Sequence, residues 1–141
     1  NKKQKALGAF GQALRIDDQL IKALYNKGRI LYDFKRKAEA VVCYERALKI
    51  KPDFVEALIS QGSVLANLGK LDQALVVFNK VLELKPKFVD LWYNKGIILR
   101  RLKRSQEAKI AFNKVLELDS GHMQSRFHKF VIFIKKLIEK Q

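Results

Sequence analysis

The chain has 141 residues, of which 48% are hydrophobic and 30% charged, a composition that predicts one folded domain and excludes a disordered chain. The 29 Lys and Arg residues outnumber the 14 Asp and Glu residues, so the net charge of +15 favours polyanionic partners without naming one. The single cysteine, Cys43, excludes an internal disulfide and predicts a reducing, cytoplasmic location. No apolar stretch is long enough to span a membrane. Because the sequence begins Asn-Lys-Lys, we expect a fragment of a longer protein.

The apolar residues recur at helical spacing and predict eight helices. In chain order these helices span residues 2–16, 21–34, 38–50, 55–68, 72–84, 89–102, 106–118 and 123–139. The polar segment 35–37 separates the second helix from the third, and Pro52 ends the third because proline disfavours a helical residue before it. Helices this short are not stable alone in water, so they are expected to pack against one another.

Similar residues recur along the chain at a step of 34 positions. The columns include the glycines Gly28, Gly62 and Gly96, the alanines Ala6, Ala40, Ala74 and Ala108, and the aromatic residues Phe10, Tyr44, Phe78 and Phe112. Several columns with one period indicate an internal repeat. Glycine inside a helix costs up to about 1 kcal/mol relative to alanine, so its repetition indicates close contact between the two helices of a unit. We expect Trp92 to lie in the core of its repeat. Cys43, one residue before the aromatic Tyr44, is expected to be a partly buried packing residue.

The repeat resembles the tetratricopeptide repeat (TPR). In residues 89–122 the signature positions hold Trp92, Gly96, Leu99, Ala108, Phe112, Val115 and Ser120. The resemblance implies an all-α fold, a right-handed superhelical solenoid of antiparallel helix hairpins. It implies a single solenoid domain over 1–141, made of a half repeat at 1–20, full repeats at 21–54, 55–88 and 89–122, and a C-terminal capping helix at 123–141.

By the same resemblance, the first helix of each repeat lines a concave, peptide-binding groove. The groove residues are then Tyr25, Asn26, Arg29, Tyr32, Asp33, Ile59, Ser60, Ser63, Asn67, Tyr93, Asn94, Ile97, Arg100 and Arg101. An asparagine amide suits a peptide main chain because it both donates and accepts hydrogen bonds. The alternative is that the Tyr-Asn pairs only pack the repeat. The carboxylate clamp that some TPR domains use for chaperone tails is poorly matched.

Basic residues recur at the turn between the two helices of each repeat. They are Lys35, Arg36, Lys37, Lys70, Lys103 and Arg104, and we expect them to form one basic edge. This edge is either a solvated rim or a docking strip for an acidic protein tail, RNA or an anionic membrane. The last helix carries an apolar stripe of Phe127, Phe130, Val131, Ile134, Leu137 and Ile138. It is expected to cap the last hairpin, with self-association and membrane contact as alternatives.

Motifs for catalysis or metal binding are not found: there is no phosphate-binding glycine loop, and neither histidine has partners spaced for a metal. We therefore expect no enzyme and no cofactor. The resemblance implies a protein–protein interaction scaffold that holds an extended peptide or a helix of a partner, with acidic ligands as candidates. Two alternatives remain. One is a self-associating module that uses the N-terminal half repeat and the C-terminal helix. The other is a basic adaptor for RNA or an anionic membrane.

Overall fold

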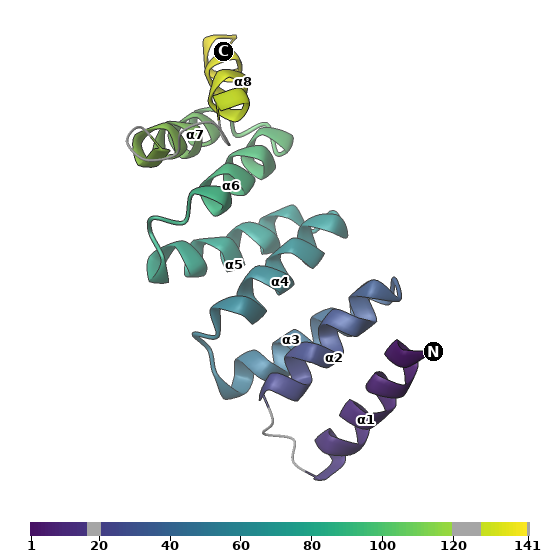
Figure 1. Cartoon of the computed structure of the whole chain (residues 1–141). Helices are drawn as coiled ribbons and strands as arrows, with labels where there is room; N and C mark the ends of the chain where they lie inside the picture. Colours follow the sequence, from purple (N-terminus) through teal and green to yellow (C-terminus); the bar gives the residue numbers. More distant parts are fainter. Residues whose placement is uncertain (17–20, 120–127, 141) are drawn as a thin grey trace. The chain divides into compact units, whose positions relative to one another are not determined.

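The computed structural model describes residues 1–16, 21–119 and 128–140, and every regular element among them is an α-helix (Figure 1). The chain divides into two compact units, Asn1–Leu84 and Lys85–Gln141. The first unit contains α1 (Lys2–Ile16), α2 (Ile21–Asp33), α3 (Lys37–Ile50), α4 (Val55–Asn67) and α5 (Leu71–Leu84). The second contains α6 (Val89–Arg101), α7 (Ser105–Asp119) and α8 (His128–Glu139).

The predicted all-α fold is confirmed. The bounds of the first seven helices differ from the prediction by at most one residue. For the last helix, residues 123–127 lie outside the described part of the chain, and α8 begins at His128. None of the described helices is long and apolar enough to cross a membrane.

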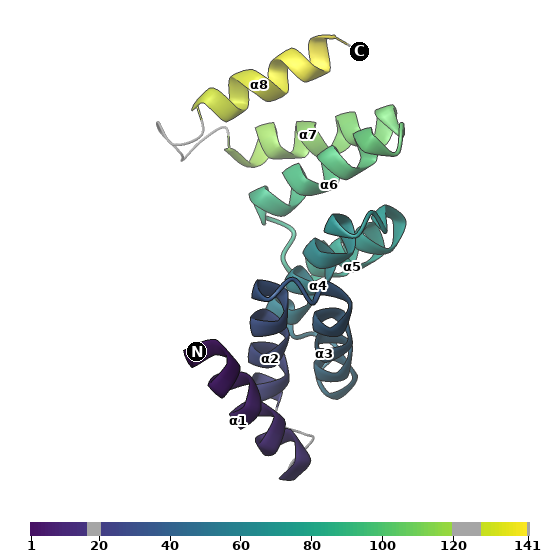
Figure 2. The ribbon, with the colours of Figure 1, turned by 90° about the vertical axis from the view of Figure 1, so that its right-hand side faces the viewer.

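Successive helices pack as hairpins, α2 with α3 and α4 with α5 in the first unit and α6 with α7 in the second (Figure 2). Each repeated glycine receives the aromatic ring of its own repeat. A Cβ atom added to Gly28 would lie 2.6 Å from Cε1 of Tyr44, and one added to Gly96 would lie 2.5 Å from Cε1 of Phe112. The close contact that the glycine column predicts is therefore made by the aromatic column.

The core of each hairpin follows the repeated columns. Ala40, Ala74 and Ala108 are fully buried, where larger side chains would separate the helices. Cys43 is buried too, and this burial raises the pKa of its thiol, which keeps it protonated and weakly nucleophilic. Trp92 departs from the prediction. It is half-buried, because its indole N–H reaches outward to donate to the Pro86 carbonyl at 2.8 Å.

The turns within the three hairpins share one backbone conformation. Lys35, Gly69 and Lys103, which are 34 residues apart, have φ angles of 64°, 77° and 59°. In the first turn the N–H of Lys35 donates to the Tyr32 carbonyl at 2.9 Å, and the next N–H donates to the Leu31 carbonyl at 2.9 Å. This pair of hydrogen bonds is the Schellman motif, which ends a helix at a left-handed residue. Glycine suits that residue, yet two of the three turns use lysine.

Candidate functional site

A pocket of about 250 Å³ opens on the first-helix side of the first unit. Its lining consists of Arg29, Tyr32 and Asp33 from α2, Tyr44 from α3, and Ile59, Ser60, Ser63 and Val64 from α4. Six of these eight residues are in the groove predicted from the sequence, and the structure brings them together. The sequence analysis missed Tyr44 and Val64 as lining residues, because it assigned Tyr44 to packing only.

The floor of the pocket is apolar with a polar point at Tyr44. This residue is 2% exposed, and its burial raises the pKa of the phenol to about 12, an effect that a hydrogen bond with the Ser60 side chain reduces. The phenol therefore stays neutral at physiological pH. Val64 is buried, and Ile59 and Ser63 are half-buried. A ligand side chain would therefore meet apolar groups together with four hydroxyl groups, those of Tyr32, Tyr44, Ser60 and Ser63.

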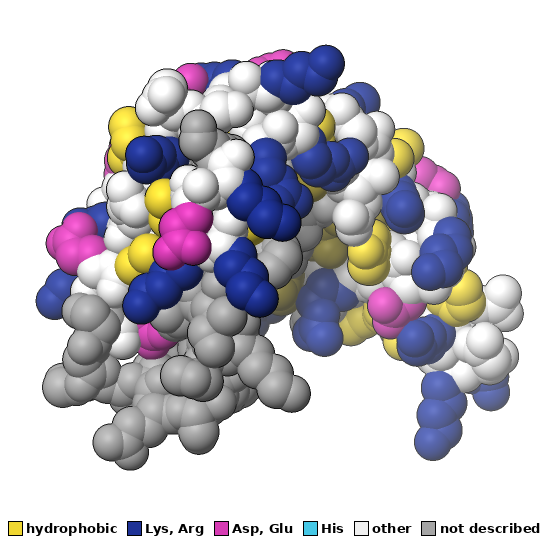
Figure 3. Space-filling view, turned by 90° about the horizontal axis from the view of Figure 1, so that it is seen from above, with side chains coloured by type: hydrophobic (Ala, Val, Ile, Leu, Met, Phe, Trp, Pro, Cys, Tyr) yellow, Lys and Arg dark blue, Asp and Glu magenta, His cyan; other side chains and the backbone are white. Residues whose placement is uncertain are grey.

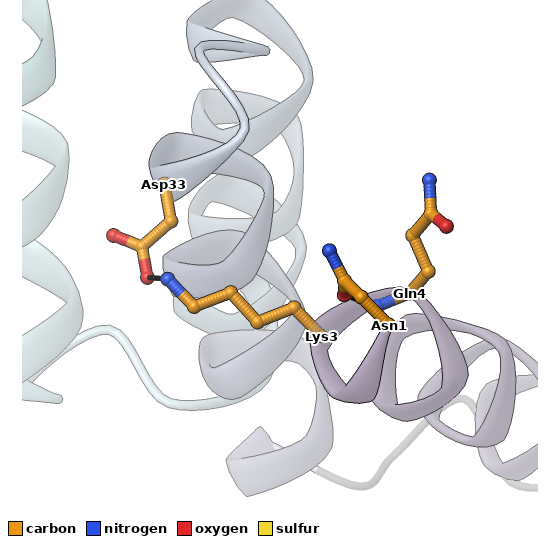
Figure 4. A network of polar contacts seen from close by, with 4 residues as sticks. All are labelled: Asn1, Lys3, Gln4 and Asp33. Carbon is orange, nitrogen blue, oxygen red and sulfur yellow. Dashed lines mark hydrogen bonds and ion pairs between the residues drawn. The ribbon is translucent and has the colours of Figure 1, made fainter.

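Two charged side chains, Arg29 and Asp33, line the pocket. Lys3 of α1 reaches the end of α2, where its Nζ lies 2.8 Å from Oδ2 of Asp33 (Figure 4). The hydrogen bond and charge of Lys3 lower the pKa of Asp33, so this carboxylate stays ionised and is balanced. Arg29 is exposed, with its guanidinium carbon 5.9 Å from the Tyr25 ring centroid. Because Lys3 balances Asp33, the charge of Arg29 favours a negatively charged ligand group at the pocket.

In the two predicted Tyr-Asn pairs, the tyrosines make aromatic contacts within the chain and the asparagines differ in exposure. The Tyr25 ring lies 5.9 Å from that of Tyr44 and 5.3 Å from that of Phe54, and the Tyr93 ring lies 6.1 Å from that of Phe112, centroid to centroid. Both tyrosines therefore pack against aromatic rings of their own repeats, and their contact with a ligand stays a prediction. The asparagines differ. Asn26 on α2 is half-buried, whereas the equivalent asparagine on α6 is exposed.

Two further predicted groove residues connect neighbouring repeats. The amide Nδ2 of Asn67, at the end of α4, donates to the hydroxyl of Tyr32 on α2 at 2.9 Å. Since Tyr32 also lines the pocket, this hydrogen bond holds one wall of the pocket in place. Each partner is accessible to solvent, so the contribution to stability is expected to be at most about 1 kcal/mol.

The remaining predicted groove residues lie on α6, in the second unit. They are Tyr93, Asn94, Ile97, Arg100 and Arg101. Asn94 and Arg101 are exposed and the other three are half-buried. Arg100 and Arg101 fall in the last turn of α6, where cations interact favourably with the helix dipole. The two arginines therefore stabilise the end of α6, whether or not they also contact a ligand.

The predicted basic edge is partly neutralised. In the α2–α3 turn, Nε and Nη2 of Arg36 donate to the two carboxylate oxygens of Glu39, both at 2.6 Å. In the α6–α7 turn, Arg104 makes the same paired contact with Glu107, at 2.7 Å for both hydrogen bonds. Each arginine lowers the pKa of its glutamate. The α4–α5 turn contributes Lys70. The positive charge of the predicted basic edge therefore comes mainly from its lysines, Lys35, Lys37, Lys70 and Lys103.

The apolar stripe of the last helix is described only in its second half. Ile134 is fully buried, and Leu137 and Ile138 are half-buried, whereas Lys135 and Lys136 are exposed. This pattern agrees with the predicted cap on α7. Phe127 and the side chains of Phe130 and Val131 lie outside the described residues. Within the described ranges, no three side chains are grouped as metal ligands.

Comparison with protein families gives one consistent result. Models described as tetratricopeptide repeat match residues 21–54, 43–76 and 89–122, and one described as TPR repeat matches residues 62–103. No curated protein sequence matches the chain significantly. The matched repeats agree with the 34-residue period and leave the partner to be found by other means.

Several solved structures resemble the chain. One is a MamA protein, with a TM-score of 0.79 and 22% identity over 84% of this chain and 64% of that one. Another is a MamA segment from Desulfovibrio magneticus RS-1, with a TM-score of 0.81 and 21% identity over 99% of this chain and 80% of that one. A third is the first TPR of Spaghetti (RPAP3) bound to an HSP90 peptide, with a TM-score of 0.69 and 21% identity over 87% of this chain and 96% of that one. Identities this low show the fold alone.

Proposed function

Because the chain belongs to the tetratricopeptide repeat family, a family of protein–protein interaction modules, we propose that it is a non-catalytic scaffold. It holds an extended segment of a partner protein against its first helices. The observation that carries this proposal is the pocket between α2 and α4, where six predicted groove residues meet. The RPAP3 structure supports it by analogy, since a similar fold is bound to a peptide in that structure.

The size and charge of the pocket restrict the ligand. A volume of about 250 Å³ lies below the range of about 300–1,000 Å³ typical of small-molecule pockets, so it suits one side chain of a longer peptide. The half-buried Ile59 and the buried Val64 favour an apolar side chain. Arg29 in the pocket lining favours a neighbouring carboxylate, since Lys3 already balances Asp33. We therefore propose a peptide in which an apolar residue is flanked by acidic ones.

A blocked pocket tests this function. Ser63→Trp fills the cavity from α4, whereas Gln73→Trp adds the same ring at an exposed position of α5 and serves as the control. Peptides are first selected on the unmodified chain from a random library, and their binding is then measured by fluorescence anisotropy. We expect Ser63→Trp to weaken binding at least tenfold, which corresponds to about 1.4 kcal/mol, and Gln73→Trp to leave it unchanged.

Asn26 on α2 provides a milder test of the first-helix side of the first unit. Asn26→Ala removes an amide that would hold a peptide main chain, with little expected change in the melting curve. If both this variant and Ser63→Trp bind the selected peptides as the unmodified chain does, the first-helix face is not the binding site.

Self-association is a second candidate, favoured by the state of α1. Ala6 and Phe10 are half-buried, whereas the column equivalents of both are buried. These are Ala40, Ala74 and Ala108 for Ala6, and Tyr44, Phe78 and Phe112 for Phe10. The half repeat thus keeps an apolar face that another helix could cover. Light-scattering mass over a concentration series tests this. A mass that rises with concentration and is reduced by Phe10→Lys would favour association through α1, and a constant monomer mass would exclude it.

A further inference from the structure

An unexpected column of apolar residues lies on the outside of the second helices. Val42 on α3, Val76 on α5 and Ile110 on α7 are 34 residues apart and are 53%, 59% and 67% exposed. A single exposed aliphatic side chain is ordinary. Three β-branched residues at one exposed helical position are less so, because β-branched residues form helices less readily than alanine, lysine or glutamate. Packing within the hairpins does not explain this column, since the side chains face solvent.

In the first unit this column adjoins a second pocket, of about 290 Å³. Its lining consists of Glu45, Leu48 and Lys49 from α3, Pro52, Leu58 and Gln61 from α4 and the preceding turn, and Lys80 from α5. It shares no lining residue with the first-helix pocket. The helix α4 packs against both α3 and α5, so it forms the floor of a groove between them. Leu58 is 3% exposed and Leu48 is half-buried, which makes this floor apolar.

The exposed valines extend this pocket along both helices. Val42 lies three residues before Glu45 on α3, and Val76 lies four residues before Lys80 on α5. Residues three or four apart share one face of a helix. On each helix the valine therefore shares a face with a charged residue that lines the pocket. We call the valines and these lining residues together the outer surface. It consists of Val42, Glu45, Leu48, Lys49, Leu58, Val76 and Lys80.

The charge of the outer surface limits what can cover it. Lys49 and Lys80 are exposed, and no ion pair is recorded for either within the described part of the chain, so the rim has two positive charges against the one of Glu45. A second copy of a chain with a net charge of +15 is repelled at long range. Figure 3 shows Lys and Arg side chains spread over the drawn face of the described surface. An acidic partner is therefore favoured over a second copy.

We propose that the outer surface binds an amphipathic helix of an acidic partner protein. A groove between two helices with an apolar floor is a recurring acceptor for such a helix, whose apolar residues at positions i, i+3 or i+4 and i+7 enter the groove. Here those residues cover Val42 and Val76 and fill the pocket over Leu48 and Leu58. Glutamates beside them pair with Lys49 and Lys80. The chain then has two binding surfaces, one on its first helices and one on its second helices.

Two designed helical peptides test the proposal directly. They share the same leucines at i, i+4 and i+7 and differ only in flanking residues, which are glutamates in one and lysines in the other. Each is added to the isotope-labelled chain while backbone amide NMR shifts are followed. We expect the acidic peptide to shift the amides of Val42, Leu48, Val76 and Lys80, and the basic peptide to shift none of them.

Reversing the charge of two lysines distinguishes specific binding at the outer surface from non-specific binding of the peptide. Lys49→Glu with Lys80→Glu changes two exposed side chains and is expected to exchange the preference, so that the basic peptide binds and the acidic one does not. Lys87→Glu with Lys109→Glu is the matched control, since both lysines are exposed and line neither pocket, and it should change neither result. The amide shifts separate the two surfaces, because Ser60 and Ser63 report on the first-helix pocket and Leu48 and Lys80 report on the outer surface.

Three results would overturn the proposal. The first is the absence of amide shifts with the acidic peptide at any concentration reached. The second is a set of shifts confined to the first-helix pocket, around Ser60 and Ser63. The third is a concentration-dependent mass that Val76→Lys abolishes, which would identify a second copy of this chain as the occupant of the outer surface.

Discussion

At the scale of single residues, the hairpins depend on the contact between a glycine and an aromatic ring. A Cβ atom on Gly62 would overlap the Phe78 ring, and Phe78 is 2% exposed, so the ring has no free space to move into. We expect Gly62→Ala to lower the free energy of unfolding by about 1–3 kcal/mol, as overpacking does. Chemical denaturation followed by circular dichroism measures this.

Gly8→Ala is the matched control for this substitution. Gly8 also lies inside a helix, but an added Cβ atom there has no neighbour within 4 Å. The change should be neutral or stabilising by up to about 1 kcal/mol, because alanine is the better helix former. Phe78→Leu should make Gly62→Ala less costly, since the two residues are coupled. Equal effects of the two glycine substitutions would show that the ring contact has no special role.

The buried phenol of Tyr44 should make stability depend on pH in the alkaline range. Its pKa is raised to about 12 in the folded chain, against about 10 in an unfolded one. The neutral form is therefore favoured by folding. Its contribution is fully present below pH 10 and is lost as the pH rises toward about 12. We expect a loss of roughly 1–2 kcal/mol over this interval relative to Tyr44→Phe, measured by urea denaturation.

The Tyr44→Phe variant is a suitable reference because the equivalent positions hold Phe78 and Phe112. Lysines and other tyrosines also titrate in this range, so only the difference between the two chains reports on Tyr44. Parallel stability curves from pH 9 to about 12 would contradict the burial of a neutral phenol.

At the scale of elements, the turns of the hairpins contain strain that substitution can remove. Lys35 has a φ angle of 64° at the left-handed position where Gly69 occurs in the next hairpin. This conformation costs an L-residue about 1 kcal/mol or more, and glycine adopts it freely. We therefore expect Lys35→Gly to raise the free energy of unfolding by up to about 1 kcal/mol and Gly69→Ala to lower it by a similar amount. Thermal denaturation of both variants checks this.

The control for this prediction is Lys35→Gln, which removes the positive charge but keeps the free-energy cost of the left-handed conformation. It should leave stability nearly unchanged, since Lys35 is exposed. A stabilisation by glutamine equal to that by glycine would assign the effect to charge repulsion among the turn lysines instead.

Most of the secondary structure was predictable from the sequence, because the 34-residue period supplies several independent indications of each helix. The sequence did not predict which way certain side chains point or which residues have a left-handed backbone conformation. Lysine at positions 35 and 103 gives no sign of a left-handed residue, and only Gly69 indicates one. Trp92 shares a column with the buried Leu24 and Leu58, yet its indole N–H bonds outward to Pro86.

The candidate site was predictable only in part. The first-helix residues were identified through the family resemblance, and the structure brings Arg29, Ser60 and four others together. The outer surface was missed, since the repeat columns that indicate the core do not include Val42 and Val76. The available indication was their position within the repeat. Each valine lies two residues from the buried alanine and two from the buried aromatic residue of its repeat, which places it about 200° around the helix from both.

At the scale of the whole molecule, the net charge of +15 should produce weak, salt-sensitive binding to nucleic acid. Arg36 and Arg104 are each held by a glutamate, so the turns offer few free guanidinium groups to phosphates. We expect binding of a fluorescent poly(U) probe at low salt to disappear between about 50 and 200 mM salt. The peptides selected for the first-helix pocket should still bind at the higher salt, because part of their contact is apolar.

A poly(U) affinity that persists at physiological salt would contradict this view and favour the basic adaptor. Lys35→Gln with Lys37→Gln then locates the contact. If the turn lysines bind phosphates, the slope of log affinity against log salt falls by roughly the two charges removed. If only the net charge of the chain matters, the same substitutions at Lys87 and Lys109, which are exposed and lie outside the hairpin turns, produce an equal change. The two pairs of variants therefore separate a localised basic edge from general electrostatic attraction.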